Sequence, residues 1–288
     1  TDNMTLYAKW NTISGVAAVN NVGYSTLQEA INAVPKNGAD YTEVVILQNI
    51  NLESPVTVKD GRKVELNIGP YAITRSNGVI FSNYATLKIK NGTITTSGSN
   101  NAYAIDNKST GVLNITGGTL SATNTSSTNT NIIANTGIVN ITGGRLNCDT
   151  QAAALDNNGG TVTMSGGEII STNSLKCQAM YNNGGTITIS GNAYLESSST
   201  NRYTLHNYSG TMYITGGTIV ANGSSAVYNK NSQTLTIGND DGTISTSTPI
   251  LQGKTYGLEL DSTATATVSD GLFWLFGSAY IYCLQYIN

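Results

Sequence analysis

Charge and long apolar runs are scarce in this chain. Only 11% of its 288 residues are charged, and 14 basic residues against 17 acidic ones give a net charge of −3. A chain with this balance lacks the basic patch that attracts nucleic acid or an anionic membrane. No apolar run approaches the ~20 residues of a membrane span. We therefore expect no nucleic-acid partner and no membrane insertion.

Cysteine and histidine are too few for the common metal sites. The three cysteines, Cys148, Cys177 and Cys283, form no C-x-x-C pair, and His206 is the single histidine. A structural zinc site needs about four such ligands, and an odd number of cysteines leaves at least one thiol free. The stretch "GNDDGT" at 238–243 lacks the spaced acidic ligands of a calcium loop. We expect no metal and no cofactor, and we expect Cys148 to be a core residue.

Threonine, serine, asparagine and 31 glycines are abundant instead. This mixture favours strands that end in tight turns. Residues 113–120 read "LNITGGTL", residues 139–146 read "VNITGGRL", and looser copies follow. The alternation predicts a half-buried strand, and the glycine pair predicts a turn with positive φ. The apolar residues that open the copies recur about every 24 residues: Val64, Leu87, Leu113, Val139, Val162, Ile187, Met212, Leu235 and Leu258.

A second repeated signal lies about fifteen residues downstream in each copy. It is a four-residue phrase such as "AIDN" or "AVYN" that ends in asparagine. Asparagines stacked in register can hydrogen-bond to one another as a ladder. The predicted ladder residues are Asn107, Asn135, Asn157, Asn182, Asn207 and Asn229. The two signals together predict an all-β, right-handed parallel β-helix solenoid of about ten coils; helical and leucine-rich repeats lack support in the pattern.

The two ends of the solenoid need caps. Residues 13–43 are expected to form the N-terminal cap, with a short helix at 25–34 that a capping box of Ser25 and Gln28 begins. The apolar face of this helix consists of Leu27, Ala30, Ile31 and Val34. Residues 44–288 would form the β-helix, with a C-terminal cluster of aromatics as its plug or, alternatively, as a docking patch for another domain. These aromatics are Phe273, Trp274, Phe276, Tyr280, Tyr282 and Tyr286.

Two resemblances follow from these motifs. The periodic strands, glycine turns and asparagine ladder over about 44–282 resemble the right-handed parallel β-helix of the pectate-lyase-like superfamily, a fold that serves lyases, hydrolases, adhesins and phage tail proteins alike. The octet "NMTLYAKW" at 3–10 resembles the closing strand of an internalin-type B repeat. That resemblance implies that 1–12 is the tail of an upstream β-grasp repeat with its linker. It further implies a secreted, wall-associated protein of Gram-positive type, in which neighbouring domains of the same chain are partners.

One column of side chains is the candidate site. If the ladder asparagines point inward, the residues before them point outward, and these are Asp106, Ala134, Asp156, Tyr181, His206 and Tyr228. For a glycan ligand, the binding residues would be Tyr181, His206, Tyr228 and Asp156, because aromatic faces stack on sugar rings. For an enzyme, the catalytic residues would be Asp106, Asp156 and His206. The two aspartates, two coils apart, would be separated by about 10 Å, at the edge of the range for an inverting glycosidase.

Three functions remain open from the sequence. The favoured one is a noncatalytic, extracellular module that binds a glycan or a host or cell-surface ligand as an adhesin. The alternatives are a polysaccharide-cleaving hydrolase or lyase and a structural spacer whose polar column is simply solvated. A basic residue other than His206 is missing from the column, which argues against a lyase. A deep cleft beside the longer loops at 97–101 and 124–131 would favour cleavage, a shallow aromatic face binding, and a flat polar face the spacer.

Overall fold

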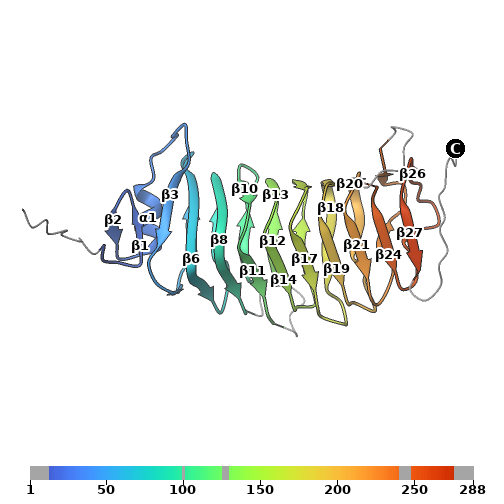
Figure 1. Cartoon of the computed structure of the whole chain (residues 1–288), viewed down its shortest axis with the longest axis horizontal. Helices are drawn as coiled ribbons and strands as arrows, with labels where there is room; N and C mark the ends of the chain where they lie inside the picture. Colours follow the sequence, from blue (N-terminus) through green and yellow to red (C-terminus); the bar gives the residue numbers. More distant parts are fainter. Residues whose placement is uncertain (1–12, 99–100, 125–129, 240–247, 276–288) are drawn as a thin grey trace, which may run out of the picture.

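The computed structural model describes residues 13–98, 101–124, 130–239 and 248–275, without the side chain of Trp274. The chain forms an all-β parallel solenoid of about nine turns with one short helix. Its strands lie side by side along the long axis, with the helix at the N-terminal end (Figure 1). The predicted fold is confirmed, with about nine turns in place of ten. The tail at 1–12, the acidic pair of "GNDDGT", Cys283 and the aromatics from Phe276 onward lie outside the described residues.

Each coil contributes strands to three parallel sheets. The first sheet contains, in order, β3 (Thr42–Ile46), the first halves of β6 (Lys63–Arg75) and β8 (Thr86–Thr96), β10 (Val112–Ile115), β13 (Ile138–Ile141), β16 (Thr161–Met164), the second halves of β18 (Gln178–Ile189) and β20 (Leu205–Ile214), β23 (Thr234–Ile237) and β26 (Thr267–Val268).

The second sheet contains β4 (Ile50–Asn51), the second halves of β6 and β8, β11 (Thr119–Ala122), β14 (Arg145–Cys148), β17 (Glu168–Ser171), β19 (Tyr194–Ser197), β21 (Thr218–Ala221), β24 (Ile250–Gly253) and β27 (Leu272–Leu275). The third sheet contains β5 (Val56–Val58), β7 (Phe81–Asn83), β9 (Tyr103–Asn107), β12 (Asn131–Asn135), β15 (Ala153–Asn157), the first halves of β18 and β20, β22 (Val227–Asn229) and β25 (Leu258–Leu260).

The repeated phrase produces the turn between the first two sheets. Leu113 pairs with Leu87 on one side and with Val139 on the other, so equivalent apolar residues stack inside the solenoid. Gly144, the second glycine of "TGG", has a φ of +82°. A Cβ atom there would lie 2.9 Å from the carbonyl oxygen of Gly117 in the coil before. Stacked tight turns therefore require glycine, as the sequence predicts.

The predicted series of opening residues is wrong at its last member. Leu258 pairs with Val227 in the third sheet, whereas the first sheet continues from Thr236 to Thr267. The connection from β23 to β24 is longer than the equivalent turns of earlier coils. After a spacing of about 24 residues the chain has therefore reached only the third sheet, one sheet short of a full coil.

The N-terminal cap begins with an antiparallel hairpin. Its strands are β1 (Ala17–Val19) and β2 (Val22–Tyr24), and β1 also pairs antiparallel with β3. This pairing covers the first edge of the first sheet, which would otherwise present unpaired backbone groups. The helix α1 (Leu27–Ala33) packs against β1, β2 and β5.

The helix covers 27–33 where 25–34 was expected, and its N-cap lies one residue later than expected, in a different capping box. Thr26 is the N-cap, with extended backbone, and its Oγ1 accepts from the N–H of Glu29 over 3.2 Å. The carboxylate of Glu29 accepts from the N–H of Thr26 over 3.0 Å and from the hydroxyl of Ser25 over 2.7 Å. A Glu at the third helical position completes the box better than Gln28, which is used elsewhere. The predicted apolar face is confirmed as buried: Leu27, Ala30, Ile31 and Val34.

Two side chains, Gln28 and Arg62, attach the helix to the first coil. The Gln28 side-chain amide accepts from the N–H of Thr57 over 2.7 Å and donates to its carbonyl over 3.1 Å. The Gln28 side chain thus occupies the hydrogen-bonding groups of β5 on the side opposite its partner strand β7. The buried guanidinium of Arg62 donates to the carbonyls of Val34 and Asn32 over 3.1 Å and 3.2 Å, where the helix leaves acceptors unpaired.

The interior of the solenoid is a continuous column of apolar side chains from Leu27 to Leu251. Cys148 is buried in it, as expected, and so is Cys177; both are free thiols. Within the described part of the chain, no helix has the length and apolar character needed to cross a membrane.

Candidate functional site

An uninterrupted ladder of asparagine side chains supports the third sheet from inside. Each Nδ2 donates to the Oδ1 of the asparagine in the next coil over 2.7–2.9 Å. The ladder joins Asn83, Asn107, Asn135, Asn157, Asn182, Asn207 and Asn229, all of them buried. The sequence named six of these; Asn83 was missed because "FSN" lacks the shared phrase. The ladder fixes which way the intervening residues point.

The residue before each ladder asparagine belongs to one column on the outer face of the third sheet. Strand register places the predicted residues next to one another in the order Asp106, Ala134, Asp156, Tyr181, His206 and Tyr228. The column continues to Ser82 at one end and to Glu259 at the other. Asp106 and Asp156 therefore stand two coils apart, and Tyr181 separates Asp156 from His206.

Four tyrosines surround His206. The rings of Tyr181, Tyr203 and Tyr228 contact it edge-on, at centroid distances of 5.1, 5.4 and 5.0 Å, and the ring of Tyr208 lies 5.9 Å away. We name this group, with His206 at its centre, the tyrosine cluster. Its histidine is only 6% exposed, although the sequence predicted an outward, solvent-facing stripe. That expectation is corrected for His206, because the tyrosine rings cover it.

Within the tyrosine cluster, some ring faces are already in use. Tyr203 and Tyr228 stack on each other with centroids 4.2 Å apart and planes at 5°. The ammonium of Lys230 lies 3.7 Å from the centroid of Tyr208. These contacts hold the rings of Tyr203, Tyr208 and Tyr228 in place.

The imidazole of His206 is neutral and has one unpaired nitrogen. The side-chain nitrogen of Gln178 lies 3.2 Å from Nδ1. An amide NH₂ only donates, so Nδ1 is the acceptor and Nε2 carries the proton. Nε2 is buried and has no hydrogen-bond partner. Burial, reinforced by the charges of Arg202 and Lys230, lowers the pKa of His206 to about 4.

Asp156 is the second unsatisfied group of the column. Its Oδ1 is buried without a hydrogen-bond partner. Burial raises the pKa of the Asp156 carboxyl above its usual value, because an ionised carboxylate is poorly solvated there. The charge of Asp156 in turn contributes to the raised pKa values of Tyr103 and of Tyr181, although burial is the larger cause in both. The pKa of Tyr181 reaches about 12, so its phenol is a neutral donor at pH 7.

The two outermost carboxylates of the column, those of Asp106 and Glu259, both have partners. Asp106 forms an ion pair with Lys108, whose Nζ lies 2.6 Å from Oδ2. At the other end, the carboxylate of Glu259 accepts from the hydroxyl of Tyr203 over 3.2 Å and from that of Ser225 over 2.5 Å. Lys108 does not belong to the column but stands beside it, two residues after Asp106, as a basic neighbour.

Three of the five site residues that the sequence analysis missed follow the periodicity of a strand. In a strand, residues i and i+2 share a face. Lys108, Tyr208 and Lys230 each stand two positions after a column residue, so this signal was present in the sequence. Gln178 and Tyr203 lie three positions before column residues, where the coil bends into the third sheet, and strand periodicity alone does not predict their contacts.

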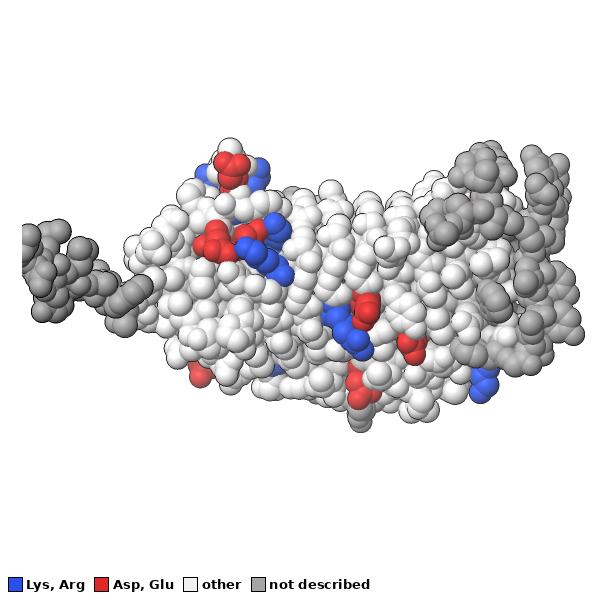
Figure 2. All heavy atoms as spheres, in the orientation of Figure 1, with Lys and Arg blue, Asp and Glu red and all other residues white. Residues whose placement is uncertain are grey.

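Charged residues elsewhere on the surface are sparse, and some of them form small paired groups. Figure 2 shows two such groups on one face, together with several separate charged residues. Lys88 and Lys90 pair with Glu65 and Glu43 on the first sheet. Arg145 and Glu168 pair on the second sheet over 2.9 Å, as the sequence suggested. Across the part of the chain that the structure describes, no three His, Cys, Asp or Glu residues are grouped to hold a metal ion.

Comparison of the chain with protein-family models, curated proteins and solved structures finds no match. The architecture and the site chemistry therefore carry the functional argument.

Proposed function

We propose that this chain is a noncatalytic glycan-binding module of a bacterial cell-surface protein, with the outer face of its third sheet as the binding face. One observation carries the proposal. Among the described residues, three buried side-chain atoms lack a hydrogen-bond partner, and two of them are Asp156 Oδ1 and His206 Nε2. Both belong to the predicted column, on either side of Tyr181. Unpaired buried polar groups are rare and call for a reason.

The two unpaired groups are complementary to a sugar. A sugar hydroxyl both donates and accepts, so one hydroxyl can donate to the Asp156 carboxylate and another can accept from His206 Nε2–H. Both atoms are covered in this structure, so binding requires a neighbouring side chain to turn outward, and we assign that movement to Tyr181, which lies between them. The turned ring then offers an apolar face to the ring of the sugar. The free energy of pairing two unsatisfied groups offsets the cost of moving Tyr181.

The surface location rests on separate support. Residues 3–10 resemble the end of an internalin-type B repeat, and the fold resembles pectate-lyase-like β-helices, many of which act outside the cell. The extracellular, wall-associated location and the neighbouring domains of the same chain are part of the proposal.

A polysaccharide hydrolase is the second candidate, and one contrast favours it. Burial raises the pKa of Asp156, as a general acid requires, while Asp106 two coils away is ion-paired with Lys108. Two carboxyl groups in unlike environments are typical of inverting glycosidases. Binding remains the better proposal, because Asp156 and Asp106 stand two coils apart, about 10 Å, at the outer edge of the range for an inverting glycosidase pair.

The test combines binding and cleavage assays on the whole chain. A broad glycan array measures binding, and incubation with a panel of polysaccharides is followed by assays for new reducing ends and unsaturated products. The variants are Tyr181→Ala and the double variant Tyr181→Ala with Tyr228→Ala. Tyr213→Ala is the matched control, because Tyr213 is an exposed tyrosine on the first sheet.

Binding without products, lost in the double variant and kept in Tyr213→Ala, supports the proposal. Release of products that Asp156→Asn abolishes would replace it with the hydrolase. If neither binding nor products are detected, or if binding survives the double variant, this face is not a glycan site. If neither is detected, the structural spacer is the remaining function.

A further inference from the structure

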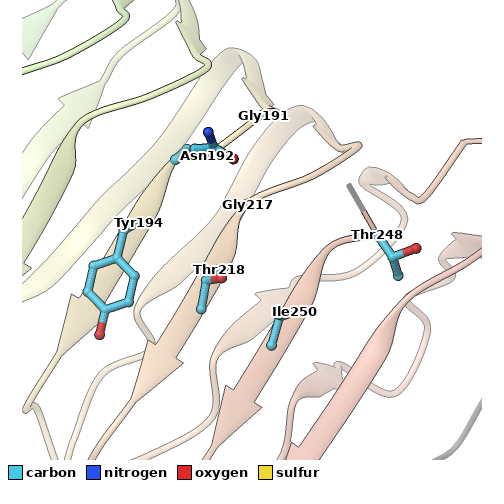
Figure 3. A pocket seen from close by; sticks show the side chains of 8 residues that line it. Gly191, Asn192, Tyr194, Gly217, Thr218, Thr248 and Ile250 are labelled. Atoms are coloured by element: carbon cyan, nitrogen blue, oxygen red, sulfur yellow. The ribbon is translucent and has the colours of Figure 1, made fainter. Parts of the chain in front are cut away.

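A cavity of about 180 Å³ opens on the second sheet, away from the tyrosine cluster (Figure 3). Tyr194, Thr218 and Ile250 form one wall, as outward residues in register on the adjacent strands β19, β21 and β24. The remaining lining comes from the corner between the first and second sheets. The complete lining is Gly191, Asn192, Ala193, Tyr194, Gly217, Thr218, Thr248 and Ile250.

The cavity has a local cause in the sequence. Four coils turn this corner with Thr-Gly-Gly or Ser-Gly-Gly, at 116–118, 142–144, 165–167 and 215–217, but residues 190–193 read "SGNA", one residue more. Gly191 takes a φ of +57°, and the N–H of Asn192 donates to the carbonyl of Ser165 over 3.1 Å. The next coil returns to the tight turn at Gly217, with a φ of +85°. The enlarged corner beside a tight one produces the hollow.

Tyr194 is held in place as a fixed wall of the cavity. Its hydroxyl donates to the carboxylate of Glu196 over 2.8 Å, and the same carboxylate accepts from the side-chain amide of Asn222 over 2.6 Å. Burial and the neighbouring Glu196 raise the pKa of Tyr194 to about 12. A neutral, anchored ring loses little conformational entropy when a ligand packs against it.

The lining combines apolar and uncharged polar groups. Tyr194 and Ile250 supply apolar surface, Asn192 supplies an amide, and Thr218 supplies a hydroxyl. None of the eight lining residues is Asp, Glu, Lys, Arg or His, so a charged ligand would lose its hydration without gaining a counter-ion. The volume equals that of about six water molecules and is smaller than a typical drug-sized pocket. A cavity of this size fits a single small ring.

We propose that this cavity binds one neutral pyranose, as the terminal residue of a glycan. A neutral pyranose has an apolar face of C–H groups to pack on Tyr194 and Ile250 and hydroxyls for Asn192 and Thr218. The site lies on a different sheet from the tyrosine cluster and does not depend on it.

The experiment uses the whole chain, labelled with ¹⁵N, and four probes: the methyl β-glycosides of glucose, galactose, mannose and N-acetylglucosamine. We expect at least one of them to shift the backbone amide signals of Tyr194, Gly217 and Thr218 with a Kd in the millimolar range. Tyr194→Ala should weaken that binding by about tenfold or more, and Thr218→Val, which keeps the shape but removes the hydroxyl, by a smaller factor. Tyr213→Ala is the control for a general effect of losing a surface tyrosine.

The two proposals are separable. The double variant at Tyr181 and Tyr228 should leave the binding in the cavity unchanged. Absence of shifts with all four probes overturns the cavity proposal whatever the glycan array shows. The cavity proposal is also overturned if Thr218→Val and Tyr194→Ala, both correctly folded, bind the probe as tightly as wild type does.

Discussion

The side-chain amide of Asn157 donates a hydrogen bond to Oδ1 of Asn182 over 2.9 Å, and Asn182 repeats the bond to Asn207 over 2.9 Å. Each asparagine is both donor and acceptor, so the ladder ties every coil from Asn83 to Asn229 to the next. Nδ2 of Asn182 also reaches the carbonyls of Gly185 and Thr211. The ladder therefore also satisfies backbone acceptors at the bend after the third sheet.

Replacing Asn182 with leucine should destabilise the fold by about 2–4 kcal/mol, because it leaves the donor of Asn157 and the acceptor of Asn207 without their ladder partners. Asn183→Leu is the matched control: the neighbouring side chain is exposed and makes one bond, of 3.3 Å, to Asn158. Urea unfolding of both variants measures the difference. Equal midpoints for the two would show that the ladder adds nothing to stability.

Asp156→Asn should stabilise the protein at pH 7. The folded protein raises the pKa of Asp156, so ionisation at neutral pH costs folding free energy that the unfolded chain does not lose. The advantage of the variant should shrink as the pH falls through the raised pKa and should be lost below 3.8, where the wild-type carboxyl is protonated in both states. Urea midpoints at pH 7 and at acid pH, compared between wild type and variant, test this. A variant that is less stable at pH 7 would contradict the assignment.

His206 should titrate far below a free histidine, near pH 4. It is the only histidine in the chain, so its imidazole gives one histidine signal by NMR and the titration is unambiguous. Because the folded pKa is lowered, the unfolded chain takes up the proton first. Stability should therefore fall as the pH drops from about 6.5 to about 4, by up to about 3 kcal/mol.

His206→Phe keeps a ring at this position and removes the titrating group. The variant should lack the loss of stability between pH 6.5 and 4 that is due to the imidazole. A wild-type histidine that titrates near 6.5 would mean that the tyrosine cluster is open to water.

Arg62→Met should destabilise the N-terminal cap by about 2–4 kcal/mol, because the carbonyls of Asn32 and Val34 lose their buried donor. Hydrogen exchange of the amides in α1 should accelerate more than that of the central coils. Arg145→Met is the control, since the exposed pair of Arg145 with Glu168 contributes only about 0–1 kcal/mol. The prediction is wrong if both substitutions have the same effect.

Most of the architecture followed from local patterns. The glycine turns, the alternation of "LNITGGTL" and the recurring asparagine each report on the backbone within a few residues, and a solenoid repeats those local rules in every coil. The order of the column from Asp106 to Tyr228 followed for the same reason, because parallel register keeps equivalent residues adjacent.

The errors have equally physical causes. Leu258 was placed in the wrong sheet because the long connection after β23 breaks the repeat. The sequence predicts Ser25 as the N-cap because Ser25 and Thr26 both fit the capping-box rule. Only the extended backbone angles of Thr26 identify it as the N-cap. Arg62 was missed because its partners lie in the helix carbonyls, about 30 residues away.

The sequence by itself determined the solenoid, the phase of its inward and outward residues, and the ladder, because each depends on periodicity along one strand. Only the tertiary structure decided which polar atoms are satisfied. The burial of His206 beneath four tyrosines, the unpaired oxygen of Asp156 and the cavity beside Tyr194 arise from contacts between coils and around corners. The physical reason is that desolvation depends on everything that surrounds a group, whereas a strand pattern specifies only the direction in which it points.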